Sequence, residues 1–299
     1  MSEVKEKIDF LIIGAQKSAT SWLYDCISEH PQICVPKQKK EIEYIGGELY
    51  KKNGLEWYFS LLNHCGGEKV KGDVSVEYLY NENSPELLKQ FLPNVKLIVS
   101  LRNPNERAIS AYYWYLRKGL LPSDKSMSET LTYLKESHEE GKKNVAGIDI
   151  IERGIYDEQL ARYLKYFDGS QLLVLLYEEI ELNPKAVLKK LFAFLNVDEN
   201  FIPKSMLDKP KQNSYSKLVI KFERLNPNSK IIAGIAHGLN RVLLSFGNKE
   251  KSSPLEKDGA GILSELYKDS INKTKSIIES LPVNNQPKMD ILKTWDKKS

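Results

Sequence analysis

Three short apolar runs stand out along the chain, and each ends at glycine or at polar residues. They are Asp9 to Ile13 (DFLII), Val95 to Leu101 (VKLIVSL) and Gln171 to Tyr177 (QLLVLLY). Short apolar runs without polar alternation are typical of strands that a sheet buries on both faces. The pattern therefore predicts three buried strands.

Stretches with the apolar spacing of helices separate and follow these strands. One begins at Thr20 and places Trp22, Leu23, Cys26 and Ile27 on one face. Further helices are predicted over Asn105 to Arg117, Met127 to Glu139, Asp157 to Phe167, Lys185 to Leu195, Ile231 to Phe246 and Ile262 to Leu281. Buried strands that alternate with helices indicate βαβ units, so we expect an α/β fold with a central parallel sheet. No repeat or low-complexity linker divides the sequence, and we expect one domain over residues 1–299.

The composition is that of a globular protein with a sizeable core. The 299 residues are 41% hydrophobic and 10% aromatic, and the net charge of +4 is too small to indicate a nucleic-acid binder. Cys26, Cys34 and Cys65 show no CxxC spacing and are odd in number, so neither a disulfide framework nor a zinc site is expected. No run approaches the roughly 18 apolar residues of a transmembrane helix, and the start MSEVKEKID is charged. We expect a cytoplasmic protein with reduced thiols.

A glycine loop follows the first predicted strand. It reads GAQKSAT, from Gly14 to Thr20, and leads into a helix. Backbone N–H groups and the positive end of the helix dipole converge in such a loop, which suits an anion; Lys17 adds a charge and Ser18 a hydroxyl. It is not a Walker A loop, because Gln16 stands where the second glycine is required. An ordinary strand-to-helix turn is the alternative.

A second group of polar residues follows the second strand, in LRNPNERAISAYYWYLRKG. Arg102 stands at the strand end, and Ser110 lies two turns into the next helix. Together they can form a second anion clamp, since Arg supplies a fork of donors and Ser a hydroxyl; a surface arginine and a helix-interior serine are the alternative. Open α/β sheets bind ligands at the carboxyl ends of their strands. The two groups therefore favour a ligand with two separated anionic ends.

These motifs, in this order and spacing, carry a family resemblance. DFLIIGAQKSATSWLYDCISEHPQI, KEIEYI and VKLIVSLRNPNERAISAYYWYLRKG resemble the sulfotransferase superfamily that uses 3′-phosphoadenosine 5′-phosphosulfate (PAPS), above all its carbohydrate (heparan sulfate-type) and bacterial branch. Weaker similarity continues to about Leu195. The resemblance implies a P-loop-like central parallel sheet flanked by helices, with a donor-binding core over about residues 8–200 and a C-terminal helical part over about 201–299. It also implies PAPS as co-substrate, PAP as product and no metal.

The resemblance assigns the residues that hold PAPS. Residues of the glycine loop and of the helix start would bind the 5′-phosphosulfate: Gln16, Lys17, Ser18, Ala19, Thr20, Ser21 and Trp22. Arg102 with Ser110 would bind the 3′-phosphate. A basic and polar loop, Lys209 to Leu218, stands where the family closes over the nucleotide, and it offers Lys211, Asn213 and Ser214. A solvent loop is the alternative for this last segment.

The segment PKQKKEIEYI, Pro36 to Ile45, would supply the catalytic base. In the carbohydrate enzymes the motif reads roughly Lys-Glu-x-His-Phe-Phe, which implies Glu41 as the base and Lys17 as the group that stabilises the leaving phosphate. Glu43 replaces the histidine and is a second candidate, because residues 41 and 43 point to the same side of an extended segment. A solvated charged stretch is the alternative.

A second departure from the family lies in Gly72 to Leu79 (GDVSVEYL), which is similar to a family segment GEKTPSYL. Val74 replaces a lysine that assists at the sulfuryl group, and Val76 replaces the proline. Lys40, Lys71 or Lys17 alone would have to supply the missing cation.

The acceptor site is expected in segments that surround this scaffold: Tyr112 to Gly119 (YYWYLRKG), Leu121 to Met127 and Asn226 to Gly261. Four consecutive aromatics cannot all face one side of a helix, and rings near Arg117 and Lys118 suit a sugar or an anionic polymer. Packing of two rings in the core and two on the surface is the alternative. We expect a hydroxyl or amine acceptor: a sugar, a glycolipid or a secondary metabolite. An apolar face on residues 231–246 would instead admit a lipid or polyketide chain.

Two other functions remain open at this point. A P-loop kinase or NTPase needs Mg²⁺ held by a hydroxyl and by an acid at a strand end; Ser18 qualifies, but VKLIVSLR ends in Arg102 without an aspartate. A non-catalytic nucleotide-binding protein of the same fold is the other, because Glu43 and Val74 depart from the family pattern. The oligomeric state is not predicted.

Overall fold

The computed structural model describes residues 8–37, 44–122, 124–142, 144–208 and 254–295. The chain forms two compact units, each assembled from segments that are far apart in the sequence. The first comprises Met1–Arg102, Tyr156–Lys211 and Ile271–Thr294, and the second Asn103–Ile155, Gln212–Ser270 and Trp295–Ser299. The single domain over 1–299, with its core over about 8–200, stays a prediction.

The first unit contains a five-stranded parallel sheet. Its strands are β1 (Phe10–Gly14), β2 (Ile33–Cys34), β3 (Val70–Val74), β4 (Lys96–Leu101) and β5 (Leu172–Leu176). They lie in the order β2-β3-β1-β4-β5, and every pairing is parallel. All carboxyl ends therefore meet at one edge, with β1 in the centre. The predicted α/β fold with a central parallel sheet is confirmed.

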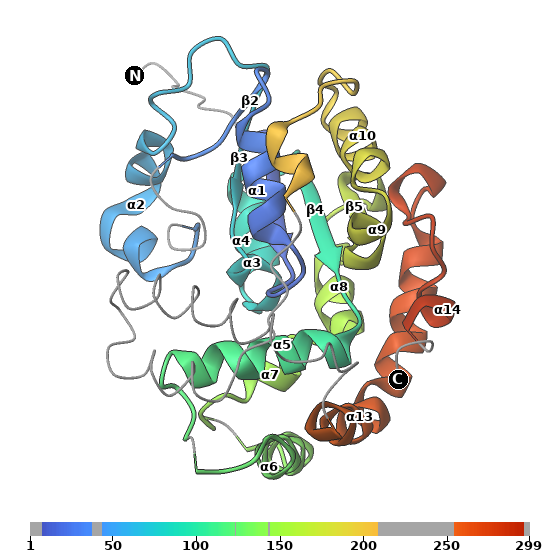
Figure 1. Cartoon of the computed structure of the whole chain (residues 1–299). Helices are drawn as coiled ribbons and strands as arrows, with labels where there is room; N and C mark the ends of the chain where they lie inside the picture. Colours follow the sequence, from blue (N-terminus) through green and yellow to red (C-terminus); the bar gives the residue numbers. More distant parts are fainter. Residues whose placement is uncertain (1–7, 38–43, 123, 143, 209–253, 296–299) are drawn as a thin grey trace. The chain divides into compact units, whose positions relative to one another are not determined.

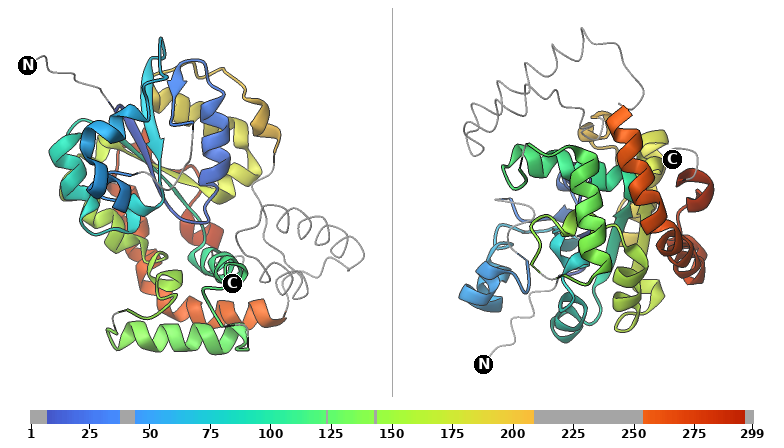
Figure 2. Two further views of the ribbon diagram at one scale, coloured as in Figure 1. Left: turned by 90° about the vertical axis from the view of Figure 1, so that its left-hand side faces the viewer. Right: turned by 90° about the horizontal axis from the view of Figure 1, so that it is seen from below.

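Helices cover both faces of this sheet. Those of the first unit are α1 (Thr20–Ser28), α2 (Glu48–Ser60), α3 (Glu77–Tyr80), α4 (Ser84–Phe91), α8 (Tyr156–Leu164), α9 (Tyr177–Leu182), α10 (Pro184–Leu195) and α14 (Ile291–Trp295), with short 3₁₀ turns η1 (Gly169–Gln171), η2 (Lys204–Leu207) and η3 (Val283–Asn285). Phe10, Ile12 and Leu173 pack with the apolar sides of α1 and α10 in one core. In Figure 2 (left), α1 lies on one side of the sheet and α3 and α4 on the other. The core fixes the strand ends that carry the functional loops.

The second unit is helical. It contains α5 (Pro104–Arg117), α6 (Met127–Glu139), α7 (Asp149–Glu152) and the first part of the long helix α13 (Pro254–Ser280), whose later residues belong to the first unit (Figure 1). The Asn103 side chain caps α5 by accepting from the N–H groups of Asn105 and Glu106. Arg107 is fully buried and donates to the Ile150 carbonyl, while the Tyr267 hydroxyl donates to the Ile151 carbonyl at 2.8 Å. A buried polar network thus joins α5, α7 and α13.

The predicted elements agree with the observed ones to within one to three residues at most ends. The three predicted strands are β1, β4 and β5, and the predicted helix from Met127 to Glu139 has those bounds. The predicted C-terminal helix begins eight residues earlier, at Pro254. The predicted helix over 231–246 lies outside the described residues. The prediction missed β2 and β3, since β2 has two residues and β3 (VKGDV) carries polar residues and glycine. It also missed the helices α2, α3, α4, α7, α9 and α14.

Candidate functional site

The glycine loop connects β1 to α1 at the centre of the sheet edge. Gly14 ends β1, and a Cβ added there would lie 2.9 Å from the Leu79 Cβ, so only glycine fits. Lys17 and Ala19 have left-handed backbone angles, with φ of 69° and 65°. Such angles are uncommon outside glycine and cost of order 1 kcal/mol each, and they cluster at ligand sites. The sequence does not reveal them, because neither residue is a glycine or an asparagine.

Several polar groups of the loop are buried without a protein partner. Ser18 is fully buried, and its Oγ has no hydrogen-bond partner among the residues that the structure describes. The same holds, within those residues, for Gln16 Oε1 and Trp22 Nε1. Ala19 precedes α1 and provides no side-chain cap for the first N–H groups of the helix. Of these atoms the Ser18 hydroxyl is a donor next to the start of α1, and a buried donor beside a helix N-terminus suits an anionic ligand; Gln16 Oε1 is an acceptor, and Trp22 packs in the core.

Arg102 lies at the carboxyl end of β4, the strand beside β1. The loop and β4 are joined directly, because Ala15 N–H donates to the Ser100 carbonyl at 2.8 Å. The Arg102 guanidinium lies 4.3 Å from the ring centre of Tyr177, which follows β5, and its carbonyl accepts from the Tyr156 hydroxyl at 2.9 Å. The structure therefore places the predicted Arg102 on the same sheet edge as the glycine loop. Ser110 belongs to α5 of the second unit, and the exposed fraction of this residue is 7%.

A buried network at the end of β3 was not predicted. The hydroxyls of Tyr58 and Tyr78 donate to Asp73 Oδ2 at 3.2 and 3.1 Å, and Asp73 Oδ1 accepts from Val74 N–H at 2.6 Å. The Tyr78 oxygen accepts from Ile45 N–H at 3.0 Å. Burial raises the pKa of both tyrosines well above the usual value, and the charges of Asp73 and of the other tyrosine add to this for Tyr78. The acid and the tyrosine in GDVSVEYLY were a signal that sequence reasoning left unused.

The candidate bases lie outside the described residues. These are Glu41 and Glu43, and the same applies to Lys40 and to the predicted nucleotide contacts Lys211, Asn213 and Ser214. The described residues on both sides of the base segment are anchored. The Pro36 carbonyl accepts from the Tyr24 hydroxyl of α1 at 2.8 Å, and Ile45 is bound by Tyr78.

The position of the missing family lysine is apolar in this protein. Val74 is 1% exposed and packs in the core of the first unit. Lys71, a suggested replacement, lies three residues earlier in β3 and pairs with Cys34. At about 3.3 Å per residue the two Cα atoms are about 10 Å apart, and their side chains point to opposite faces of the sheet. This placement favours Lys17 or Lys40 over Lys71 as the compensating cation.

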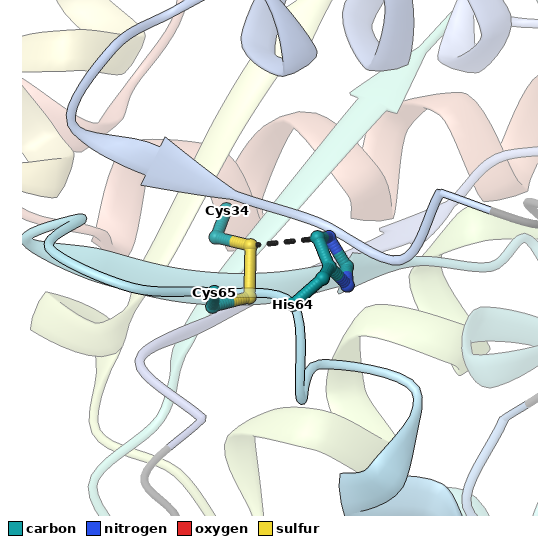
Figure 3. Close-up of side chains that lie close together, drawn as sticks. All are labelled: Cys34, His64 and Cys65. Atoms are coloured by element: carbon teal, nitrogen blue, oxygen red, sulfur yellow. Dashed lines mark hydrogen bonds between the residues drawn. A yellow bond between two sulfur atoms is a disulfide. The ribbon is translucent and has the colours of Figure 1, made fainter.

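The cysteines correct one prediction. Cys34 and Cys65 form a disulfide, and His64 Nε2 lies 3.5 Å from the Cys34 sulfur (Figure 3). The expectation of reduced thiols is therefore wrong for this pair, because the fold brings the two residues together across 31 positions of sequence. Cys26 is free and buried, and burial raises the pKa of its thiol. The cytoplasmic location was expected together with reduced thiols, and disulfides persist mainly in oxidising compartments. The disulfide therefore weighs against one ground for that expectation, and the location itself stays a prediction.

The aromatic run lies on α5, in the second unit. Tyr112 is buried, whereas Tyr113, Trp114 and Tyr115 remain partly exposed. The Tyr115 hydroxyl donates to Asp149 of α7. Leu120, just beyond the helix, is 52% exposed. One ring thus lies in the core, and the other three are partly accessible for contacts.

Within the described parts of the chain, no helix combines the length and the apolar composition that crossing a membrane requires. Among these residues, the three candidate metal ligands that lie together are Cys34, His64 and Cys65. Their two sulfurs are bonded to each other and offer no thiolate.

Comparison with known proteins gives consistent results. Bifunctional heparan sulfate N-deacetylase/N-sulfotransferase 1 of Caenorhabditis elegans is 29% identical over 198 residues, which is 64% of this chain and 22% of that protein. Membrane-associated sulfotransferase kil1 of Dictyostelium discoideum is 25% identical over 301 residues, covering 73% of this chain and 63% of that protein. The chain thus spans about a fifth of the length of the first of these relatives and somewhat under two thirds of the second.

Solved structures share the fold. A sulfotransferase from Alicyclobacillus acidocaldarius superposes with a TM-score of 0.58 at 27% identity, over 77% of this chain and 96% of that one. Mouse sulfotransferase SULT7A1 complexed with PAP gives 0.51 at 18% identity, over 98% of this chain and 89% of that one. The family described as "Sulfotransferase domain" matches residues 7–236, a stretch that includes all five strands, the glycine loop and Arg102. The chain belongs to the sulfotransferase family.

Proposed function

We propose that this protein is an enzyme that transfers a sulfuryl group from PAPS to a hydroxyl or amine group of a carbohydrate acceptor. The single observation that carries the proposal is the glycine loop. It combines the fully buried Ser18, whose Oγ has no described partner, with an uncapped helix N-terminus and Lys17. These features fit the 5′-phosphosulfate, and Arg102 at the neighbouring strand end fits the 3′-phosphate, together with Ser110 as the family resemblance implies.

The proposed reaction is an in-line displacement. The acceptor oxygen or nitrogen attacks sulfur and forms the new bond, while the bond between sulfur and the bridging phosphate oxygen breaks. The acceptor proton passes to the Glu41 carboxylate, and PAP departs with the charge that forms on its 5′-phosphate. Lys17 stabilises that charge, which is the role of a cation at a leaving group. Glu43 is the second candidate for the base.

The carbohydrate acceptor is proposed on two grounds. Two relatives, 29% identical over 198 residues and 24% identical over 271 residues, are named bifunctional heparan sulfate N-deacetylase/N-sulfotransferases. The partly exposed rings of Tyr113, Trp114 and Tyr115 suit stacking against a sugar. A glycolipid or another hydroxylated metabolite would fit the same chemistry. Lys211, Asn213 and Ser214 are proposed as further nucleotide contacts.

Transfer of labelled sulfate from PAPS tests the proposal. The acceptor panel contains an N-desulfated heparin oligosaccharide, a phenol and a long-chain alcohol, and PAP binding is measured by calorimetry. We expect transfer to the oligosaccharide. Glu41→Gln should leave PAP affinity within about twofold and lower turnover at least 100-fold, since general base catalysis contributes about 10²–10⁴.

Two outcomes would change the proposal. Full turnover in Glu41→Gln together with loss in Glu43→Gln would transfer the role of base to Glu43. Tight PAP binding without transfer to any member of the panel would favour a non-catalytic binding protein.

A further inference from the structure

The network at the end of β3 binds Ile45, which follows both candidate bases closely in the chain. It consists of Asp73, Tyr58, Tyr78 and the backbone N–H of Ile45, joined by the hydrogen bonds given above. The exposed fraction of each of these residues is 2% or less. In such surroundings a broken hydrogen bond is not replaced by water, so the arrangement is held strongly.

The direction of each proton follows from the chemistry of the groups. Burial and neighbouring charge raise the pKa of Tyr78 and Tyr58 well above the usual value, so both hydroxyls stay protonated. Each hydroxyl has one proton to donate. The Tyr78 hydroxyl lies 3.1 Å from Asp73 Oδ2 and 3.5 Å from the Tyr58 oxygen, and donates its proton on that side at the shorter distance to Asp73. Its oxygen is therefore presented to Ile45 N–H as an acceptor. Asp73 orients Tyr78, and Tyr78 holds the backbone of Ile45.

This contact lies close in the chain to the proposed base. Ile45 follows Glu41 by four residues and Glu43 by two. The Tyr44 ring packs edge-to-face on the Tyr78 ring, with 5.3 Å between the ring centres. The backbone of the chain is therefore tied down, by packing and by a hydrogen bond, immediately after the segment that carries the bases.

The other end of the network lies beside the proposed donor site. Asp73 is in β3 and is aligned with Leu11 of β1, the strand that runs into the glycine loop. Ser75 N–H donates to the Ile12 carbonyl at 3.0 Å, and Leu79 packs against Gly14. The element that holds Ile45 is thus attached to the strand end where the sulfuryl donor is proposed to bind.

We propose that Tyr78, oriented by Asp73, is a positioning residue for sulfuryl transfer. It fixes the backbone at Ile45, which follows Glu41 by four residues, and does not itself touch the reacting atoms. The inference rests on the proposed function and deepens it. Misplacement of a catalytic group by about 1 Å costs roughly 100-fold in rate, so loss of this contact is expected to lower turnover without loss of PAP binding.

Two matched variants test the inference, with labelled sulfate transfer to the oligosaccharide as the assay. Tyr78→Phe removes the acceptor of Ile45 N–H and keeps the ring that packs on Tyr44. Tyr58→Phe removes an equally buried hydroxyl that donates to the same Asp73 oxygen but does not contact Ile45. We expect Tyr78→Phe to lower kcat about 10- to 100-fold and Tyr58→Phe to lower it about twofold or less, both with PAP affinity unchanged. Hydrogen exchange of the Ile45 amide should accelerate in Tyr78→Phe alone.

The outcomes separate this inference from the proposed function. Equal losses of kcat in the two variants, or a loss of PAP affinity in Tyr78→Phe that matches its loss of rate, would show a merely structural role. An unchanged kcat in Tyr78→Phe, in an enzyme that Glu41→Gln inactivates, would overturn this inference alone. Absence of transfer by the unmodified protein would overturn the proposed function, and this inference with it.

Discussion

At the scale of single residues, the glycine loop adopts backbone angles that cost conformational free energy. Lys17 and Ala19 adopt left-handed backbone angles without being glycines. A tight turn with no ligand gains nothing from such angles, and Gly or Asn would stabilise it. Their presence, beside a buried Ser18 Oγ that has no partner in the described part of the chain, supports an anion site over the ordinary strand-to-helix turn.

Arg102 provides a prediction at this scale. Arg102→Ala should weaken PAP binding about 10- to 150-fold, because a hydrogen bond to a charged group contributes about 1.5–3 kcal/mol. Arg102→Lys should recover only part of the affinity, since lysine keeps the charge but loses the planar fork and its stacking on Tyr177. Titration calorimetry with PAP measures both.

Tyr177→Phe is the matched control for Arg102. It keeps the ring beneath the guanidinium and removes only the hydroxyl that donates to Glu181 at 2.9 Å. Its PAP affinity should stay within about twofold of the unmodified protein, because the ring that contacts the guanidinium is retained. Unaltered PAP affinity in Arg102→Ala would refute the role of this residue in the 3′-phosphate site.

At the scale of elements, the disulfide joins the edge strand β2 to the segment after α2. β2 contains only Ile33 and Cys34 and pairs with β3 along one side. Such a short edge strand has few hydrogen bonds of its own, and the bond from Cys34 to Cys65 closes a loop that contains the whole base segment. The cross-link therefore stabilises the edge strand β2, which directly precedes the base segment in the chain.

Removal of this cross-link is the prediction at this scale. Cys34→Ser combined with Cys65→Ser should lower the free energy of unfolding by about 3.7 kcal/mol, the loop-closure value for a separation of 31 residues. Denaturant unfolding with and without a thiol reductant measures the difference. The reductant should destabilise the unmodified protein and leave the double variant unchanged, since Cys26 is the one cysteine that remains and cannot form a disulfide within the chain. Equal stability of the two proteins would show that the disulfide does not form in solution.

At the scale of the whole molecule, PAP binding should stabilise the fold. At 100 times its dissociation constant, a ligand that binds only the folded protein adds about 2.7 kcal/mol. For a chain of 299 residues this corresponds to a rise in Tm of about 4 °C. Magnesium with ATP at the same concentration should raise Tm much less, because the end of β4 supplies Arg102 and no aspartate for the metal.

Lys17→Ala is the control for this measurement. It should reduce the shift that PAP produces, since the ligand would bind more weakly, and should leave the Tm without ligand nearly unchanged. A larger shift with magnesium and ATP than with PAP would contradict the proposed donor.

The sequence by itself determined the central strands, most of the longer helices and the family. Continuous apolar runs such as Leu172–Leu176 are typical of strands buried on both faces, and local spacing is sufficient to place helices such as Met127–Glu139. The glycine loop and Arg102 were also predictable, because their motifs are contiguous in the chain. Their arrangement on one sheet edge follows from the parallel topology.

Only the tertiary structure decided the features that depend on pairing between distant residues. β3 is recognised as a strand by its position between β1 and β2, since VKGDV has no strand pattern of its own. Cys34 is bonded to Cys65, and Asp73 accepts hydrogen bonds from Tyr58 and Tyr78. Tyr78 in turn accepts from Ile45 N–H. All of these contacts form because folding of the chain brings residues distant in sequence together around the sheet. A one-dimensional pattern contains the residue types of these contacts but not their distances, and the contacts exist only once the core has formed.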